Sequence, residues 1–281
     1  MTFKIGYSTY ALKLMDPFSA VKMIKDCSYE YLEICLSEGW QTSPLSFNNS
    51  EQDSLRIFIS DLGFPSPVYF GNIDVCASQQ DRPAMIELTQ KKFEMARRLH
   101  HDETPVIVTT TPGHSSPKWD AGKNQIRDSF LSLADMAAQN DLIIAIEAHA
   151  GTDFETPEKA VWLMNETRHP NLKLDLDISH FVVEGNEMIH SVDICAPYAS
   201  MVHIKDGDKE NDEVRFCLPG EGGINVKRFL EALRKNQLEN IPVFAEVSLQ
   251  ISSRASYEPR MVADFCFRVL DDARNALKWS T

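Results

Sequence analysis

The residues best suited to do chemistry are carboxylates and imidazoles that sit at the ends of apolar, β-rich runs. The run IAIE ends in Glu147, LDLD ends in Asp177, MVHIK contains His203, and VFAE ends in Glu246. Taken singly, such a residue is usually a helix cap, a surface charge or a satisfied core histidine. Three carboxylates brought to one point would repel one another unless a cation neutralised them. The pattern therefore predicts a divalent metal site at these four residues.

The predicted donor set is hard and rich in oxygen, because it holds three carboxylates, one imidazole and no thiolate. Mn²⁺ or Mg²⁺ fits such a set best, with Co²⁺ and Zn²⁺ as alternatives. The 6 cysteines are scattered and form no CxxC pair. This usage is typical of reduced, buried thiols and disfavours a disulfide framework or a zinc–thiolate site.

Short β-rich runs alternate with longer amphipathic runs along the chain, and this alternation must position the four residues. Strands are expected at residues 3–8, 30–35, 65–70, 105–110, 142–147, 172–177, 201–205 and 242–247. Helices are expected at residues 16–27, 82–100, 122–140, 156–167, 225–236 and 259–278, with a shorter one near 186–196. The alternation predicts a (β/α)8 barrel made of a single domain over residues 1–281. In such a barrel the carboxyl ends of the strands meet at one rim, where active sites are built.

The overall charge argues against nucleic acid as a partner. The formal net charge is -13, and no run rich in Lys or Arg occurs, so a phosphate backbone would be repelled. The N-terminal residues lack the pattern of a secretory signal, and no long apolar stretch indicates a membrane span. We expect a cytoplasmic protein that does not bind membranes.

Five motifs together resemble a known family. IAIEAHAG, LDLDISH, MVHIKDG, PGEGGINVKRFLEAL and VFAEVS are similar to the sugar phosphate isomerase/epimerase family with a xylose isomerase-like TIM barrel. That family includes hydroxypyruvate isomerases, ketose 3-epimerases and inosose dehydratases, and the likeness covers essentially the whole chain. It implies that Glu147, Asp177, His203 and Glu246 bind one metal ion, and that Glu147 and Glu246 are the catalytic acid and base.

The resemblance also implies a reaction and a substrate class. We expect an isomerase or epimerase that removes a proton next to a metal-chelated carbonyl of a sugar or polyol, through an enediolate. A dehydratase or other lyase remains open, since its first step is the same. A non-catalytic sugar-binding protein is the alternative from another class. The partner is a small carbohydrate, and the family makes a homo-oligomer an expectation.

Four further polar side chains are predicted to bind substrate. The resemblance places His180, the histidine of D-x-x-H, against substrate near the metal. His149 lies two residues after Glu147, and Lys205 lies two residues after His203. For Lys205, the alternative to substrate binding is a structural ion pair with Asp206. His114 lies in a loop after the fourth strand that could close over a sugar.

Two other features stay open at this point. Asp175 shares the inward pleat face with Asp177 but lies one layer deeper, so it must find a buried partner. Glu33 ends the second strand and either lines the pocket or carries a structural charge. The glycines of PGEGG could expose backbone N–H groups to a phosphate, but Glu221 among them would repel a dianion, which favours an unphosphorylated substrate.

Overall fold

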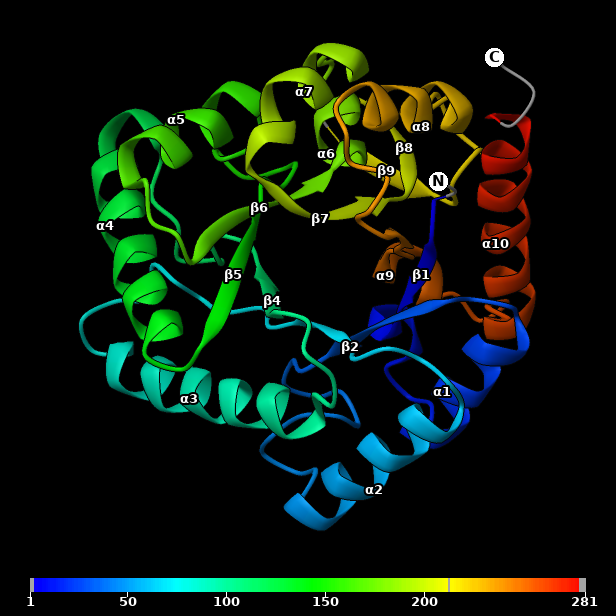
Figure 1. Cartoon of the computed structure of the whole chain (residues 1–281). Helices are drawn as coiled ribbons and strands as arrows, with labels where there is room; N and C mark the ends of the chain where they lie inside the picture. The colour runs from blue at the N-terminus through cyan, green and yellow to red at the C-terminus, as the bar shows by residue number, and fades with distance from the viewer. Residues whose placement is uncertain (1–2, 212, 278–281) are drawn as a thin grey trace.

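Eight parallel strands close into a barrel in the computed structural model, which describes residues 3–211 and 213–277 (Figure 1). The strands are β1 (Ile5–Ser8), β2 (Tyr31–Cys35), β3 (Val68–Phe70), β4 (Val106–Thr110), β5 (Leu142–Glu147), β6 (Leu172–Asp177), β7 (Ala199–Ile204) and β10 (Val243–Ala245). Each strand pairs with its neighbour in sequence, and β1 closes the barrel by pairing with β10. The predicted strands and the predicted fold class are confirmed.

The strand register brings the polar strand ends together. Asp177 on β6 lies opposite His203 on β7, and Glu147 on β5 lies opposite Asp175. Successive side chains of a strand point to opposite faces. Leu174 and Leu176 therefore pack in the core beneath the helices. Asp175 and Asp177 face the barrel axis instead. This alternation explains why a strand that reads as buried carries two carboxylates.

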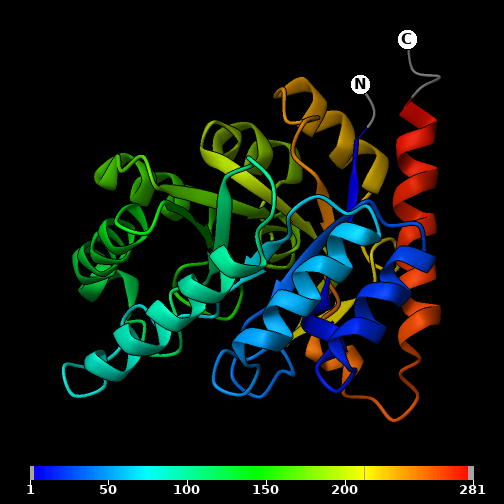
Figure 2. The ribbon, with the colours of Figure 1, turned by 60° about the horizontal axis from the view of Figure 1, so that its bottom comes forward.

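The helices form a ring outside the barrel, as Figures 1 and 2 show. They are α1 (Pro17–Asp26), α2 (Asn49–Asp61), α3 (Arg82–Leu99), α4 (Trp119–Ala138), α5 (Pro157–Thr167), α6 (Ile178–Val183), α7 (Met188–Cys195), α8 (Val226–Lys235), α9 (Leu249–Ser252) and α10 (Pro259–Ala276). Asp16 and Thr156 cap α1 and α5 by accepting backbone N–H groups, each followed by proline at the first helical position. The last helix, α10, packs beside α1 and β1, so the two ends of the chain meet. One residue of the helix expected at 259–278, Lys278, lies outside the described residues.

Helices α2, α6 and α9 and the strands β8 and β9 go beyond the predicted set. Helix α2 is absent from the expected helices although Asn48 and Glu51 form a capping box at its start. The short helix α6 follows β6 directly. A two-stranded hairpin, β8 (Asp206–Glu210) and β9 (Glu213–Cys217), follows β7. The outer part of the hairpin is charged and exposed, and the polar and apolar alternation of β9 covers only residues 213–216, which is a short signal for a strand.

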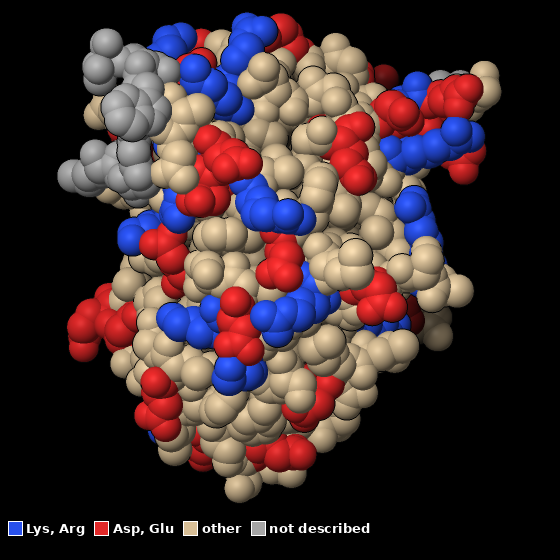
Figure 3. All heavy atoms as spheres, turned by 90° about the vertical axis from the view of Figure 1, so that its right-hand side faces the viewer, with Lys and Arg blue, Asp and Glu red and all other residues tan. Residues whose placement is uncertain are grey.

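Charged side chains of both signs are interspersed on the face of the molecule shown in Figure 3. On this face the negative net charge of the chain is therefore not gathered into one continuous acidic area. None of the helices in the described part of the chain combines the length and the apolar character that crossing a membrane requires.

Candidate metal centre

The four predicted metal ligands converge at the carboxyl end of the barrel. Glu147 ends β5, Asp177 ends β6, His203 lies on β7 and Glu246 follows β10. One donor atom from each lies within 4.8 Å of the others, and all four residues are buried. Because these strands are neighbours in the barrel, their ends share one rim, as the sequence analysis predicts.

The ammonium group of Lys205 lies among the carboxylates. It donates to Asp177 Oδ2 and to Glu246 Oε1, the latter at 2.9 Å, and lies 3.8 Å from Glu147 Oε1. Burial alone would lower the pKa of Lys205, but the three carboxylates hold it well above its usual value. Lys205 thus reaches the centre, whereas the alternative pairing with Asp206 does not form. One positive charge faces three negative ones, which leaves the centre deficient in positive charge.

The three carboxylates differ in their proton affinity. Burial raises the pKa of Glu147 and that of Glu246. Burial also acts to raise the pKa of Asp177, but the Lys205 ammonium outweighs it and leaves this pKa below its usual value. Asp177 therefore keeps its negative charge more readily than the two glutamates do.

Below the rim, Asp175 and Glu33 flank the imidazole of His203. Asp175 Oδ2 lies 3.0 Å from His203 Nδ1, and Glu33 Oε2 lies 3.3 Å from His203 Nε2. All three side chains are fully buried. Burial raises the pKa of Asp175 to about 7, whereas the two acids raise the pKa of His203 despite its burial. The charged partner of Asp175 is thus the metal-ligand candidate His203, which it meets in an ion-pair contact without a hydrogen bond.

The backbone fixes the tautomer of His180. The Ala150 N–H donates to His180 Nδ1 at 3.1 Å, so Nδ1 carries the lone pair and the proton is on Nε2. Burial lowers the pKa of His180 well below its usual value and keeps the ring neutral. Nε2 lies 3.1 Å from Glu147 Oε1 but makes no hydrogen bond. His180 therefore presents a free N–H to the centre, which suits a substrate oxygen better than a metal ion.

The other two predicted substrate-binding histidines lie at different distances from this centre. The His149 ring packs against the His180 ring with centroids 4.0 Å apart, and its Nδ1 donates to Ala150 O. It therefore lies beside the centre. His114, in contrast, is 88% exposed at its side chain and contacts Asp74 at 3.2 Å. The structure does not bring His114 to the metal-ligand candidates.

The PGEGG loop has no backbone N–H groups free for a phosphate at the positions that could grip one. The buried carboxylate of Asp206 accepts from the N–H groups of Gly207, Gly220 and Gly222 at 2.9, 3.2 and 3.0 Å, and also from that of Ile224. A Cβ at position 222 would lie 2.4 Å from Asp206 Oδ1, so glycine is required for this close approach. Asp206 thus occupies the anion-binding position of the loop, in agreement with the expectation of an unphosphorylated substrate.

An aromatic wall that the sequence analysis misses lies on the opposite side of the rim. Tyr10 stacks on Trp40 with ring centroids 5.2 Å apart and meets Phe70 edge to face at 5.1 Å. Burial raises the pKa of Tyr10, and the charge of Glu246 raises it further, which places this phenol in the field of the centre. The signal in the sequence is an aromatic residue near the end of each of the first three strands.

The residues present fit a divalent cation. Several buried polar atoms of the centre make no hydrogen bond within the described residues, namely Glu33 Oε2, Glu147 Oε1, Asp175 Oδ1 and Oδ2, His180 Nε2, and His203 Nδ1 and Nε2. Unsatisfied buried polar atoms destabilise a fold, so their accumulation at one point indicates that a ligand completes the site. Carboxylate oxygens and imidazole nitrogen are suitable donors for such an ion.

Comparison with known proteins agrees with this geometry. The family described as xylose isomerase-like TIM barrel matches residues 21–260. An inosose dehydratase of Geobacillus thermodenitrificans is 29% identical over 146 residues, which is 47% of this chain and 47% of that protein. The matched segment thus spans less than half of that relative.

Two solved structures show the same fold at low identity. The probable 3-DHS dehydratase of Bacillus anthracis is 16% identical, with a TM-score of 0.77 over 95% of this chain and 98% of the other. D-Psicose 3-epimerase of Clostridium cellulolyticum is 17% identical, with a TM-score of 0.71 over 98% of this chain and 99% of the other. One fold therefore carries both a dehydratase and an epimerase among these neighbours.

Proposed function

The chain belongs to the xylose isomerase-like TIM barrel family, and on this premise we propose that it is a metal-dependent isomerase or epimerase of a sugar or polyol. The observation that carries the proposal is the pair of buried glutamates, Glu147 and Glu246, which approach one point from different strands with raised pKa values. A carboxylate with a raised pKa is a good proton acceptor and donor near neutral pH. Two of them around one ligand can remove a proton and return it at another position or face.

The metal we propose is Mn²⁺ or Mg²⁺, held by Glu147, Asp177, His203 and Glu246. When bound there, it would supply the positive charge that acidifies the neighbouring C–H group and stabilises negative charge on the substrate oxygen. Asp175 and Glu33 would hold the His203 ring in place for this role.

The remaining steps use side chains of this chain. Glu246 would take the proton from the carbon next to the carbonyl, and Glu147 would deliver a proton to the product. His180 would donate its Nε2–H to a substrate oxygen, which its fixed tautomer allows. Tyr10 and Trp40 would contact the ligand from the side of the site opposite His180. The faces of their aromatic rings suit the C–H surface of a sugar.

A dehydratase is the second candidate, and Lys205 is the observation that favours it. An ammonium group hydrogen-bonded to Glu246 could protonate a departing hydroxyl group after the carboxylate has removed the carbon-bound proton. The inosose dehydratase that matches the chain also supports this alternative. The two candidates differ only in whether the intermediate is reprotonated or loses water.

Proton exchange in deuterated water tests the proposal. Metal-loaded protein is incubated with a panel of ketoses, inososes and other keto-polyols, followed by NMR for exchange and mass spectrometry for loss of water. Exchange together with a rearranged isomer supports the isomerase or epimerase, and a dehydrated product supports the second candidate. Binding without exchange across the panel would instead identify a sugar-binding protein. Elemental analysis of the purified protein identifies the metal.

A further inference from the structure

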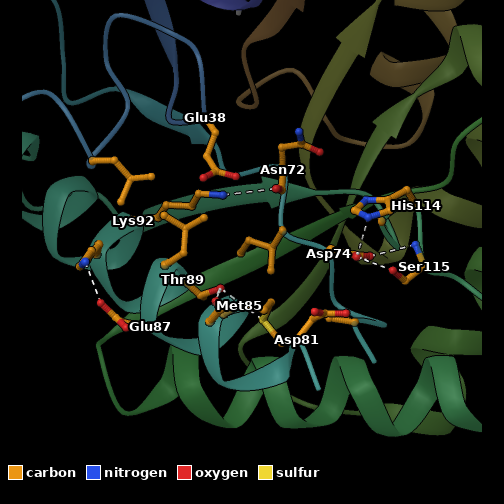
Figure 4. Close-up of a pocket in the computed structure, with 17 residues that line it drawn as sticks. Glu38, Asn72, Asp74, Asp81, Met85, Glu87, Thr89, Lys92, His114 and Ser115 are labelled. Atoms are coloured by element: carbon orange, nitrogen blue, oxygen red, sulfur yellow. Dashed lines mark hydrogen bonds and ion pairs between the residues drawn. The ribbon is translucent and has the colours of Figure 1, made fainter. Parts of the chain in front are cut away.

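A cavity lies between α3 and the segments that follow β2, β3 and β4 (Figure 4). Its volume is about 620 Å³, which is enough for a small molecule. Its lining includes Glu38, Asn72, Lys92 and His114, and it includes none of the four metal-ligand candidates. A ligand of this cavity would therefore be held by other residues than the four metal-ligand candidates.

Lys92 is the unusual residue of this cavity. It lies on α3 and is 3% exposed, although lysine is almost never fully buried without a partner. Its Nζ donates to the carbonyl oxygen of Asn72 at 3.3 Å, and within the described residues no carboxylate forms an ion pair with it. The adjacent Lys91 is exposed and pairs with Glu87 at 2.8 Å. The two neighbouring lysines thus differ in burial and in charge compensation.

The surroundings of Lys92 favour an uncharged amine. Burial lowers the pKa of Lys92 to about 8, although the charge of Glu38 acts in the opposite direction. A buried lysine amine whose lone pair is free is a nucleophile toward carbonyl compounds. The Lys92 amine donates one N–H to the carbonyl oxygen of Asn72. Because Lys92 also lines the cavity, a carbonyl compound bound in the cavity would approach this amine.

We propose that Lys92 is a covalent capture site for a small hydroxylated aldehyde or ketone. The amine nitrogen bonds to the carbonyl carbon, the carbon–oxygen bond breaks, and the oxygen leaves as water with the two protons of the amine, which yields an imine. The step is reversible and needs no oxidant or reductant. Glu38, whose charge acts on Lys92, is the group available to transfer these protons, and the side-chain amide of Asn72 offers hydrogen bonds to ligand hydroxyl groups.

Reductive trapping tests this proposal. The full chain is incubated with glyceraldehyde and sodium cyanoborohydride at neutral pH, and the modified lysines are located by peptide mass spectrometry. We expect modification of Lys92 on the order of tenfold faster than that of Lys91, because a pKa of about 8 leaves much more of the Lys92 amine uncharged than the usual value for lysine would. Lys92→Arg should abolish this adduct, whereas Lys91→Arg should leave it unchanged.

Glu38→Gln provides a second measurement, since Glu38 is exposed and its replacement should leave the fold intact. Measured well above pH 8, where the Lys92 amine is largely uncharged with or without Glu38, trapping at Lys92 should be slower because Glu38 no longer transfers protons, and the melting temperature should be unchanged. Adducts spread evenly over exposed lysines, with Lys92 labelled no faster than Lys91, would overturn the proposal. That comparison is made on the wild-type chain, so it decides the question even if Lys92→Arg does not fold.

Discussion

The charged groups at the two ends of the barrel differ in burial and in how completely they are hydrogen-bonded. At the amino end, Glu30 accepts from Lys4 Nζ at 2.6 Å and from Arg274 Nη1 at 2.5 Å, while Asp102 accepts from the N–H groups of Ser66 and Thr104 at 2.8 and 2.9 Å. At the carboxyl end, both oxygens of Asp175 and both ring nitrogens of His203 lack a hydrogen bond within the described residues.

The difference separates a stabilising role from a functional one. Charges that are paired and hydrogen-bonded contribute to stability or are neutral, whereas unsatisfied buried charges destabilise the fold. The unsatisfied buried groups at the carboxyl end therefore lower the stability of the metal-free protein, and we propose that a bound cation and substrate satisfy them. Substitutions at the two ends should accordingly affect different measurements.

The largest effect is expected for Glu246→Gln. The amide cannot accept a proton and is a weaker metal ligand, so kcat should fall by about a thousandfold, and metal affinity should fall with it. Steady-state kinetics and metal titration measure the two effects, with the melting temperature of the metal-free protein as a control. Full activity of this variant, or of the wild type after complete removal of metal by a chelator, would refute the proposed role.

Asp175→Asn should affect metal binding more than folding. Loss of the carboxylate beside His203 Nδ1 should weaken metal affinity by about 10- to 100-fold, measured by calorimetric titration. Glu33 still faces the His203 ring at 3.3 Å after this substitution, so the stability of the metal-free protein should change less than the metal affinity does. A variant with unchanged metal affinity and lower stability would make Asp175 a structural residue.

Glu30→Gln should give the reverse pattern at the other end. Weakening the contacts with Lys4 and Arg274 should lower the free energy of unfolding by about 1 kcal/mol, since these partly exposed pairs are screened by solvent. Urea denaturation measures this loss, and kcat and metal affinity should stay at wild-type values. A change in metal affinity would show that the two ends are coupled.

The smallest expected effect is a difference in the sign of the pH dependence of stability. Asp175 has a raised pKa of about 7 in the folded metal-free protein, so its contribution is present at acidic pH and lost as the pH rises toward 7. Backbone and side-chain hydrogen bonds from Ser66 and Thr104 outweigh burial and lower the pKa of Asp102, so its contribution is present above its unfolded pKa and lost as the pH falls. Urea denaturation at several pH values, with Asp175→Asn and Asp102→Asn as references, should give opposite trends.

Much of the framework could be predicted because the responsible signals are local. The barrel strands read as compact β-rich runs, and Asp16 and Thr156 mark helix starts through capping chemistry. The four ligand candidates were found because parallel strands bring their carboxyl ends to one rim, which converts positions in sequence into proximity. The structure confirms that Asp177 and His203 lie side by side in register.

What could not be predicted depends on how side chains extend in space. Lys205 reaches the carboxylates because its long side chain points inward from the end of β7, although Asp206 adjoins it in sequence. His114 lies in a loop whose course no periodic pattern determines, and it points away from the centre. The β8–β9 hairpin escaped prediction because its outer part is charged and exposed, which leaves only a short alternation to recognise.

The hydrogen bond from Ala150 N–H to His180 makes the selectivity of the site depend on a peptide group. An amide N–H cannot reverse its direction, so the imidazole can only offer hydrogen to whatever approaches Nε2. A ligand with an ammonium group at that position would meet a second donor and bind poorly, whereas a hydroxyl or carbonyl oxygen would be accepted. The backbone N–H of Ala150 thus favours sugars with oxygen at this position over the corresponding amino sugars.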